Sequence, residues 1–277
     1  MPLPFPQRFR ALAAERSPLC VGIDPSAESI RGWGLTDDLP GLRTFCERLV
    51  ETCAPVVAIM KPQAAFFERH GPDGMAVLRD TVAAIQRHGA LAIIDVKSGD
   101  IGSTAVAYGE AYLGADSAYR GDAMTTSPFL GFAALAPILD IARHAGAGVF
   151  VVVRSSNPDG SGLQRARLAD GRTVAEHLAD DVAAANGGDA LGPIGAVVGA
   201  TLGAEAGALA ARMPNALLLV PGIGAQGATI ADVRRDFGPH YARVIPSVSR
   251  GVARAGPDAQ ALRQAVERYI AELRDRV

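Results

Sequence analysis

The stretch LAIIDVKSGD (residues 91–100) joins a short apolar run to three charged residues. Short apolar runs recur along the chain. Each run is too short for a typical helix but has the usual length of a strand buried on both faces. The runs are PLCVGID (18–24), PVVAIMK (55–61), ALAIID (90–95), DAMTTS (122–127), GVFVVVR (148–154), IGAVVGA (194–200), ALLLVPG (216–222) and RVIPSVS (243–249). Amphipathic, alanine-rich segments lie between them, for example 41–53, 74–88, 131–145, 173–186 and 257–275.

This alternation predicts parallel strands joined by helical crossovers. The chain has 277 residues, which is close to the roughly 250 residues of a single (β/α)8 barrel. No linker or shift in composition divides it. We therefore expect an α/β fold, a (β/α)8 TIM barrel that forms one domain over residues 1–277. A doubly wound open sheet is the alternative.

Composition narrows the class of protein. The net charge of -2 gives no support to nucleic-acid binding. The apolar runs fall far short of the roughly 20 residues that cross a bilayer, and the proline-rich opening MPLPFPQRF is unlike a signal peptide. Cys20, Cys46 and Cys53 are odd in number and lack a CxxC spacing. We expect a cytoplasmic protein with reduced core thiols that binds neither nucleic acid nor membrane.

Polar residues or glycines follow most of the predicted strands, at Asp24, Lys61, Asp95, Ser127, Arg154, Gly199, Gly222 and Ser249. In a barrel, the C-terminal strand ends form the active-site face, so the opposite charges among these residues would converge. Residues two apart on a strand point the same way, which predicts that Asp95 and Lys97 lie side by side, with Lys61 as a neighbour. Such a cluster suits proton delivery to a carbon. A structural network of ion pairs is the alternative.

The stretch PGIGAQG (221–227) contains a GxGxxG pattern. A dinucleotide site would need an acidic residue about 20 positions on, but Arg250 stands in that region. Barrels often bind phosphate at the loops after strands seven and eight. We expect the backbone of Gly222 and Gly224, the amide of Gln226 and the guanidinium of Arg250 to hold a phosphate. A glycine-rich turn beside a surface arginine is the alternative.

With these motifs the chain resembles the orotidine 5′-phosphate decarboxylase family, and its bacterial type 2 branch most closely. The likeness is carried by LCVGIDP (19–25), KPQAAFFE (61–68), DVKSGDIGST (95–104), TTSPFLG (125–131), SNP (156–158), PGIGAQG (221–227) and SVSRG (247–251). These stretches follow the family order over nearly the whole chain. The D-x-K-x-x-D pattern alone marks only a wider suprafamily. Val96 and Ser98 stand where the usual motif of this branch has Ala and Arg.

The resemblance implies a catalytic set at the strand ends. Lys97 would give a proton to C6 of the pyrimidine. Asp95, flanked by Lys61, would lie against the carboxylate of the substrate. Asp24 and Lys61 would hold ribose hydroxyls. The implied reaction converts orotidine 5′-phosphate to UMP and CO2 in de novo pyrimidine biosynthesis, with no metal and no cofactor.

The resemblance also implies a homodimer. In the family, the second Asp of the motif enters the active site of the partner subunit, so the resemblance implies that Asp100 and Thr104 act there. The position of Asp100 past the strand that carries Asp95 agrees with this. Ser127 would bind the pyrimidine. The phosphate would be taken by Gln226, Gly222, Gly224 and Arg250.

Two other functions stay open from the sequence. Magnesium-dependent sugar-phosphate decarboxylases of the suprafamily are similar in D-x-K-x-x-D, but they would need an acidic ligand where Lys61 stands. A catalytically silent phosphate-binding barrel is the second alternative. The presence of Lys97 and Asp95 weighs against it.

Overall fold

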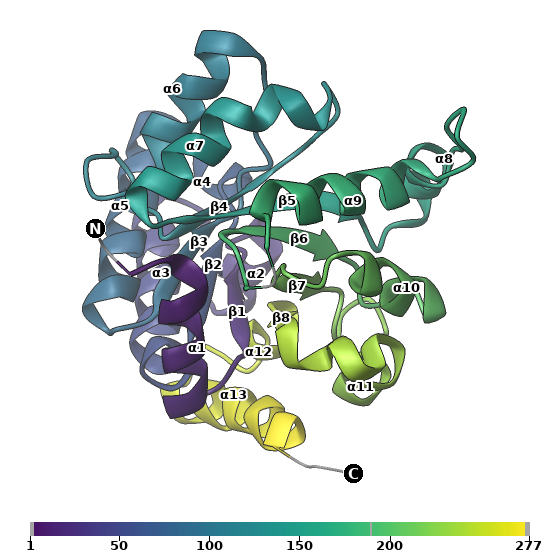
Figure 1. Cartoon of the computed structure of the whole chain (residues 1–277). Helices are drawn as coiled ribbons and strands as arrows, with labels where there is room; N and C mark the ends of the chain where they lie inside the picture. The colour runs from purple at the N-terminus through teal and green to yellow at the C-terminus, as the bar shows by residue number, and fades with distance from the viewer. Residues whose placement is uncertain (1–2, 189, 275–277) are drawn as a thin grey trace.

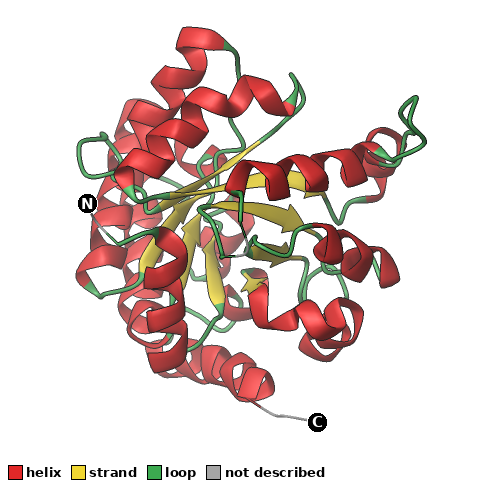
Figure 2. Ribbon diagram, viewed as in Figure 1, coloured by secondary structure: helices red, strands yellow, loops and turns green. Residues whose placement is uncertain are grey.

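The computed structural model describes residues 3–188 and 190–274, so residue 275 of the last expected helix and five other positions of the expected 1–277 domain lie outside the described residues. Eight parallel strands form a closed barrel in the order β1 to β8, surrounded by helices (Figures 1 and 2). The strands are β1 Cys20–Ile23, β2 Ile59–Pro62, β3 Leu91–Ile94, β4 Ala123–Thr126, β5 Gly148–Arg154, β6 Ile194–Val198, β7 Leu218–Pro221 and β8 Val244–Val248. The expected (β/α)8 barrel is confirmed, and closure of the sheet rules out the doubly wound alternative.

The helices follow the expected alternation. They are α1 Phe5–Glu15, α2 Ala27–Gly32, α3 Leu39–Cys53, α4 Ala65–Glu68, α5 Gly71–Arg87, α6 Gly102–Tyr112, α7 Ala136–Ala145, α8 Ser161–Gln164, α9 Val174–Asn186, α10 Ala204–Arg212, α11 Ile230–Phe237, α12 Arg250–Ala253 and α13 Ala259–Arg274. Short 3₁₀ turns are η1 Ala54–Val56, η2 Phe132–Leu135, η3 Pro158–Gly160 and η4 Gly238–Arg243. Among the described residues, no helix is both long and apolar enough to cross a membrane.

The strands alternate between two buried faces, and this alternation places the charged strand ends. On β2, Ile59 packs with the apolar residues that fill the barrel, whereas Met60 packs toward the helices. On β3, Ile93 faces the barrel interior and Ile94 faces the helices. Lys61 and Asp95 come two residues after Ile59 and Ile93, so they continue the inward-facing rows at the C-terminal mouth.

Helix α1 closes the opposite end of the barrel. Phe5 and Phe9 pack into the barrel-interior cluster, and the Phe5 ring meets Phe150 edge-on with centroids 5.7 Å apart. Arg8 pairs with the buried carboxylate of Asp122. Pro6 lies in the first turn of α1, where no backbone N–H is needed.

Candidate active site

Three charged side chains form a compact array at the barrel mouth. The Asp95 carboxylate lies between two ammonium groups, with Oδ2 2.5 Å from Lys61 Nζ and Oδ1 2.5 Å from Lys97 Nζ. Thr125 on β4 donates a hydrogen bond to Asp95 Oδ1 at 2.8 Å. Asp95 and Lys61 are buried, whereas the Lys97 side chain is 47% exposed. The array therefore has one partly exposed cation facing solvent and one buried cation beneath it.

The structure corrects the reason why Asp95 and Lys97 meet. Strand β3 ends at Ile94, and Lys97 has a left-handed backbone with φ of +50°. The two residues are therefore not successive inward positions on one strand, as the spacing predicted. A turn brings the Lys97 side chain back over Asp95, and the Lys97 backbone N–H donates to Thr125 Oγ1 at 3.0 Å. A non-glycine residue at positive φ is strained, and strain of this kind concentrates at functional sites.

The protonation states in the array are set by mutual attraction. Burial alone would raise the pKa of the Asp95 carboxyl, but the charges of Lys61 and Lys97 hold that pKa below its ordinary value. Burial alone would lower the pKa of the Lys61 ammonium, but Asp95, and then Asp24, raise it. Asp95 is therefore an anion and Lys61 a cation at neutral pH.

Asp24 follows β1 beside this array. Its Oδ1 atom is buried and has no hydrogen-bond partner among the described residues, and the same holds for Ser249 Oγ after β8. Gly22 makes their approach possible, because a Cβ at Gly22 would lie 2.8 Å from Ser249 Cβ and 3.5 Å from Asp24 Oδ1. The mouth thus carries a buried acceptor and a buried hydroxyl that could meet polar groups of a ligand.

The expected phosphate loop lies on the β7–β8 side of the mouth. Gly222 and Gly224 have φ of +112° and +76°, conformations that favour glycine. Gln226 reaches back across the loop, since its Oε1 accepts a hydrogen bond from Ser156 Oγ at 2.5 Å. Gln226 is exposed, as is Arg250, the first residue of α12 after β8. Gly222, Gly224 and Gln226 therefore follow β7, and Arg250 follows β8, as the sequence predicted.

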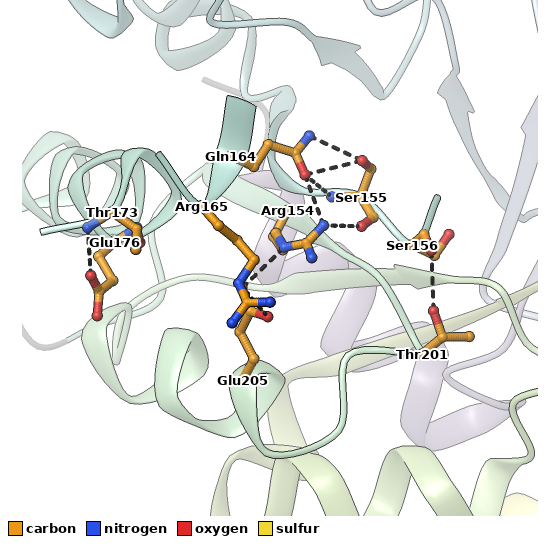
Figure 3. A network of polar contacts seen from close by, with 9 residues as sticks. All are labelled: Arg154, Ser155, Ser156, Gln164, Arg165, Thr173, Glu176, Thr201 and Glu205. Carbon is orange, nitrogen blue, oxygen red and sulfur yellow. Dashed lines mark hydrogen bonds and ion pairs between the residues drawn. The ribbon is translucent and has the colours of Figure 1, made fainter. Parts of the chain in front are cut away.

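The loop after β5 is tied to the barrel by buried Arg154 (Figure 3). Its Nε lies 3.0 Å from Glu205 Oε1 at the start of α10, and its Nη1 donates to Ser155 O and Gln164 Oε1. Gln164 in turn accepts from the Ser155 backbone N–H at 3.0 Å. Arg154 thereby joins Ser155 and Gln164 on the two sides of the loop. Ser156, the residue after Ser155, contacts Gln226. The loop carries the short helix α8.

Asp100 and Thr104 stand apart from the array. Asp100 Oδ1 accepts from the backbone N–H of Ile101 at 2.7 Å, and Thr104 is exposed on the first turn of α6. Among residues 3–188 and 190–274, Asp100 makes no ion pair with Lys61 or Lys97 under a 4.0 Å limit. The neighbouring Ile101 side chain is 61% exposed. Within one chain, the structure brings neither residue to Asp95.

Ser127 lies just beyond β4, two residues after Thr125. It lines an apolar hollow of about 330 Å³ with Phe129, Phe132 and Leu163. Its carbonyl oxygen packs against Gly99, where a Cβ would overlap it. Gly99 thus lets the loop after β3 lie directly on the end of β4.

Two contacts of the array were missed from the sequence. Thr125 bonds both Asp95 and Lys97, and Gln63 accepts from Lys97 Nζ at 3.4 Å. Thr125 could have been found, because it shares a strand face with Ser127. Val96 packs against the core, and Ser98 uses its backbone carbonyl to accept from Thr126.

Comparison with known proteins agrees with this arrangement. The family model described as "Orotidine 5'-phosphate decarboxylase / HUMPS family" matches residues 17–265. The chain belongs to this family. The match contains every strand of the barrel and all the residues of the array, so the resemblance stated from the motifs is confirmed.

Bacterial relatives and solved structures match over nearly full length. A Myxococcus xanthus protein named orotidine 5′-phosphate decarboxylase is 51% identical over 276 residues, covering 99% of this chain and 96% of the relative. A Streptomyces coelicolor protein of the same name is 50% identical, with 99% and 98% covered. The structure of Leishmania donovani OMP decarboxylase superposes with a TM-score of 0.81 at 31% identity, with 98% of both chains covered. A Streptomyces avermitilis crystal structure reaches a TM-score of 0.93 at 49% identity, with 99% and 95% covered.

Proposed function

We propose that this protein decarboxylates orotidine 5′-phosphate to UMP and CO2, as a step of de novo pyrimidine biosynthesis. The family and its named relatives indicate a decarboxylase. The observation that carries the proposal is the buried carboxylate of Asp95 held between Lys61 and Lys97. A buried anion beside a partly exposed ammonium suits the loss of one anionic group and the gain of one proton at the same carbon.

In the proposed reaction, the substrate carboxylate on C6 lies next to Asp95. Two carboxylates in one dry site repel each other, and departure of CO2 relieves that repulsion. The C6–carboxylate bond breaks and its electron pair stays on C6. The Lys97 ammonium stabilises this developing carbanion and then transfers its proton from Nζ to C6. Lys61 keeps Asp95 ionised throughout, because its own pKa is raised above the ordinary lysine value.

The rest of the mouth would bind the remainder of the substrate. The buried Oδ1 of Asp24, beside the Lys61 ammonium, would accept from a ribose hydroxyl. Ser127 would bind the pyrimidine. The phosphate would take the backbone N–H groups of Gly222 and Gly224, the Gln226 amide and the planar guanidinium of Arg250. Because the phosphate is remote from C6, its binding energy can hold the loops closed during the reaction.

We further propose that the active form is a homodimer in which Asp100 and Thr104 complete the site of the partner subunit. Support comes from the partly exposed position of Asp100 on the loop before α6 and the exposed position of Thr104 on its first turn, together with the exposed apolar side chain of Ile101 between them. A location in the cytoplasm stays a prediction from the free thiols.

The test is a direct assay. Orotidine 5′-phosphate is added to protein treated with EDTA, and its ultraviolet absorbance is followed, with UMP identified in the product. Rapid conversion that is unaffected by EDTA supports the proposal. No conversion, together with failure of UMP to bind, would contradict it. Activity restored only by added Mg²⁺ with a sugar phosphate as substrate would favour the magnesium-dependent relatives.

A further inference from the structure

Tyr269 on helix α13 contacts both segments of the expected phosphate site, the loop after β7 and the start of α12. A Cβ added at Gly224 would lie 3.0 Å from the Tyr269 hydroxyl oxygen. A Cβ added at Gly251 would overlap the same oxygen and would lie 3.1 Å from Tyr269 Cζ. Gly224 belongs to the loop after β7, whereas Gly251 directly follows Arg250 after β8. The phenol oxygen therefore lies between two glycines that are far apart in the sequence.

The two glycines are required for different reasons. Gly224 has φ of +76°, so its backbone conformation alone favours glycine. Gly251 is not among the glycines with positive φ, so only the close approach of Tyr269 excludes a side chain there. The small residue of the SRG motif is thus explained by a side chain from the C-terminal helix.

The Tyr269 ring is held firmly enough to set a distance. It is half-buried and packs against the main core, on a helix that also contacts α3, α11 and α12. The Tyr269 side chain has few rotatable bonds, so the position of α13 determines where its hydroxyl meets the two segments. Gln226 is two residues from Gly224, and Arg250 adjoins Gly251. The separation of the two phosphate-binding side chains therefore depends on the hydroxyl between the glycines.

We propose that Tyr269 is a positioning residue for the phosphate site, which spaces the loop after β7 from the start of α12 without touching the ligand itself. The proposal rests on the proposed function in that the ligand is a nucleoside monophosphate. It predicts an effect selective for the phosphate, because Lys61, Asp95 and Lys97 lie at the ends of other strands.

The experiment compares Gly251→Ala, Tyr269→Phe, Tyr269→Ala and the double variant Gly251→Ala/Tyr269→Phe. Kd is measured for UMP and for uridine, which lacks the phosphate. Gly251→Ala should weaken UMP binding by roughly tenfold or more, and removal of the hydroxyl in the double variant should recover part of that loss. Uridine binding should stay within about twofold in every variant. Tyr241→Phe, which removes a buried hydroxyl elsewhere, is the matched control.

Several results would overturn the proposal. Equal weakening of UMP binding and uridine binding would mean that Tyr269 contributes only to general stability. A double variant that binds UMP no better than Gly251→Ala would contradict the contact between the Tyr269 hydroxyl and residue 251. If Gly251→Ala fails to fold, Tyr269→Ala must still weaken UMP selectively, and an unchanged UMP Kd there contradicts the proposal. Wild-type protein that neither binds UMP nor converts orotidine 5′-phosphate would overturn the proposed function and this inference together.

Discussion

The charge array and the phosphate loops lie at the same barrel mouth but are built in opposite ways. In the array, the Asp95 carboxylate oxygens receive hydrogen bonds from Lys61, Lys97 and Thr125. On the phosphate side, Gln226 and Arg250 are exposed, and the loop that carries Gln226 contains glycines with positive φ. The groups proposed to do the chemistry are thus held by one another, whereas the groups proposed to bind the phosphate are exposed at the surface of the mouth.

This difference follows from what each region has to do. Electrostatic stabilisation of a transition state is strongest where charges are fixed in a site shielded from water. The phosphate is remote from the reacting carbon, so exposed groups that meet it from the solvent side can supply binding energy without taking part in the chemistry. Substitutions in the array should therefore impair the rate of reaction, and substitutions in the loops should impair binding.

The largest combined effect is expected from Asp95→Asn. Activity with orotidine 5′-phosphate should fall by on the order of 10³-fold or more, because the fixed anion is lost. The free energy of unfolding should fall by about 3 kcal/mol, since buried Lys61 keeps its charge without a partner. Turnover and urea unfolding measure the two effects. Asp140→Asn removes an exposed carboxylate on α7 and should match wild type in both assays.

The pH dependence of that stability loss sharpens the comparison. The Asp95 pKa lies below its ordinary value of 3.8 in the folded protein, so the unfolded chain binds more protons in acid. Stability from Asp95 is complete above about pH 5 and is lost as pH falls through 3.8 toward the lower folded pKa. The difference between wild type and Asp95→Asn should therefore shrink in acid. A difference that stays constant from pH 7 to about pH 3 would contradict an ionised Asp95.

A mixing experiment tests whether the array is completed by the partner subunit. Lys97→Ala and Asp100→Ala chains are each expected to be nearly inactive. In a mixed dimer, one site keeps both groups, so an equal mixture that exchanges subunits should recover about a quarter of wild-type activity. No recovery in a mixture shown by mass spectrometry to contain mixed dimers would place Asp100 in its own subunit's site or outside catalysis.

The phosphate loops should respond in KM. Gln226→Ala and Arg250→Ala each remove one proposed phosphate contact, and each should raise KM by roughly ten- to a hundredfold with a much smaller change in kcat. Steady-state kinetics separate the two constants. A loss confined to kcat in either variant would contradict the distinction between an array that sets the rate and loops that bind the phosphate.

The smallest effect is expected where the loop after β5 is anchored. Glu205→Gln weakens the ion pair that holds buried Arg154, so Ser156 should lose its fixed position against Gln226 and KM should rise by a few-fold. Arg165→Gln is the control, since Arg165 lies 3.9 Å from the same carboxylate but is 62% exposed. If both variants raise KM equally, the buried pair has no special role in placing the loop.

The barrel and the charged strand ends could be predicted because they follow local rules. Short apolar runs mark strands, and the inward alternation that places Ile59 and Ile93 also places Lys61 and Asp95. The left-handed turn at Lys97 could not be predicted, because it depends on the Thr125 hydroxyl of another strand. The contact of Tyr269 with Gly251 is hidden for the same reason. Helix α13 shows in the sequence, but the neighbour of each side chain does not.

Lys97→Ala tests the central claim most directly. CO2 release from orotidine 5′-phosphate is measured for wild type and for the variant in the presence of EDTA, together with the Kd of UMP for both proteins. The account predicts that turnover is abolished while UMP binding survives, because the phosphate loops lie on other strands. A Lys97→Ala protein that still releases CO2 and forms UMP at a rate near wild type would contradict the assignment of Lys97 as proton donor.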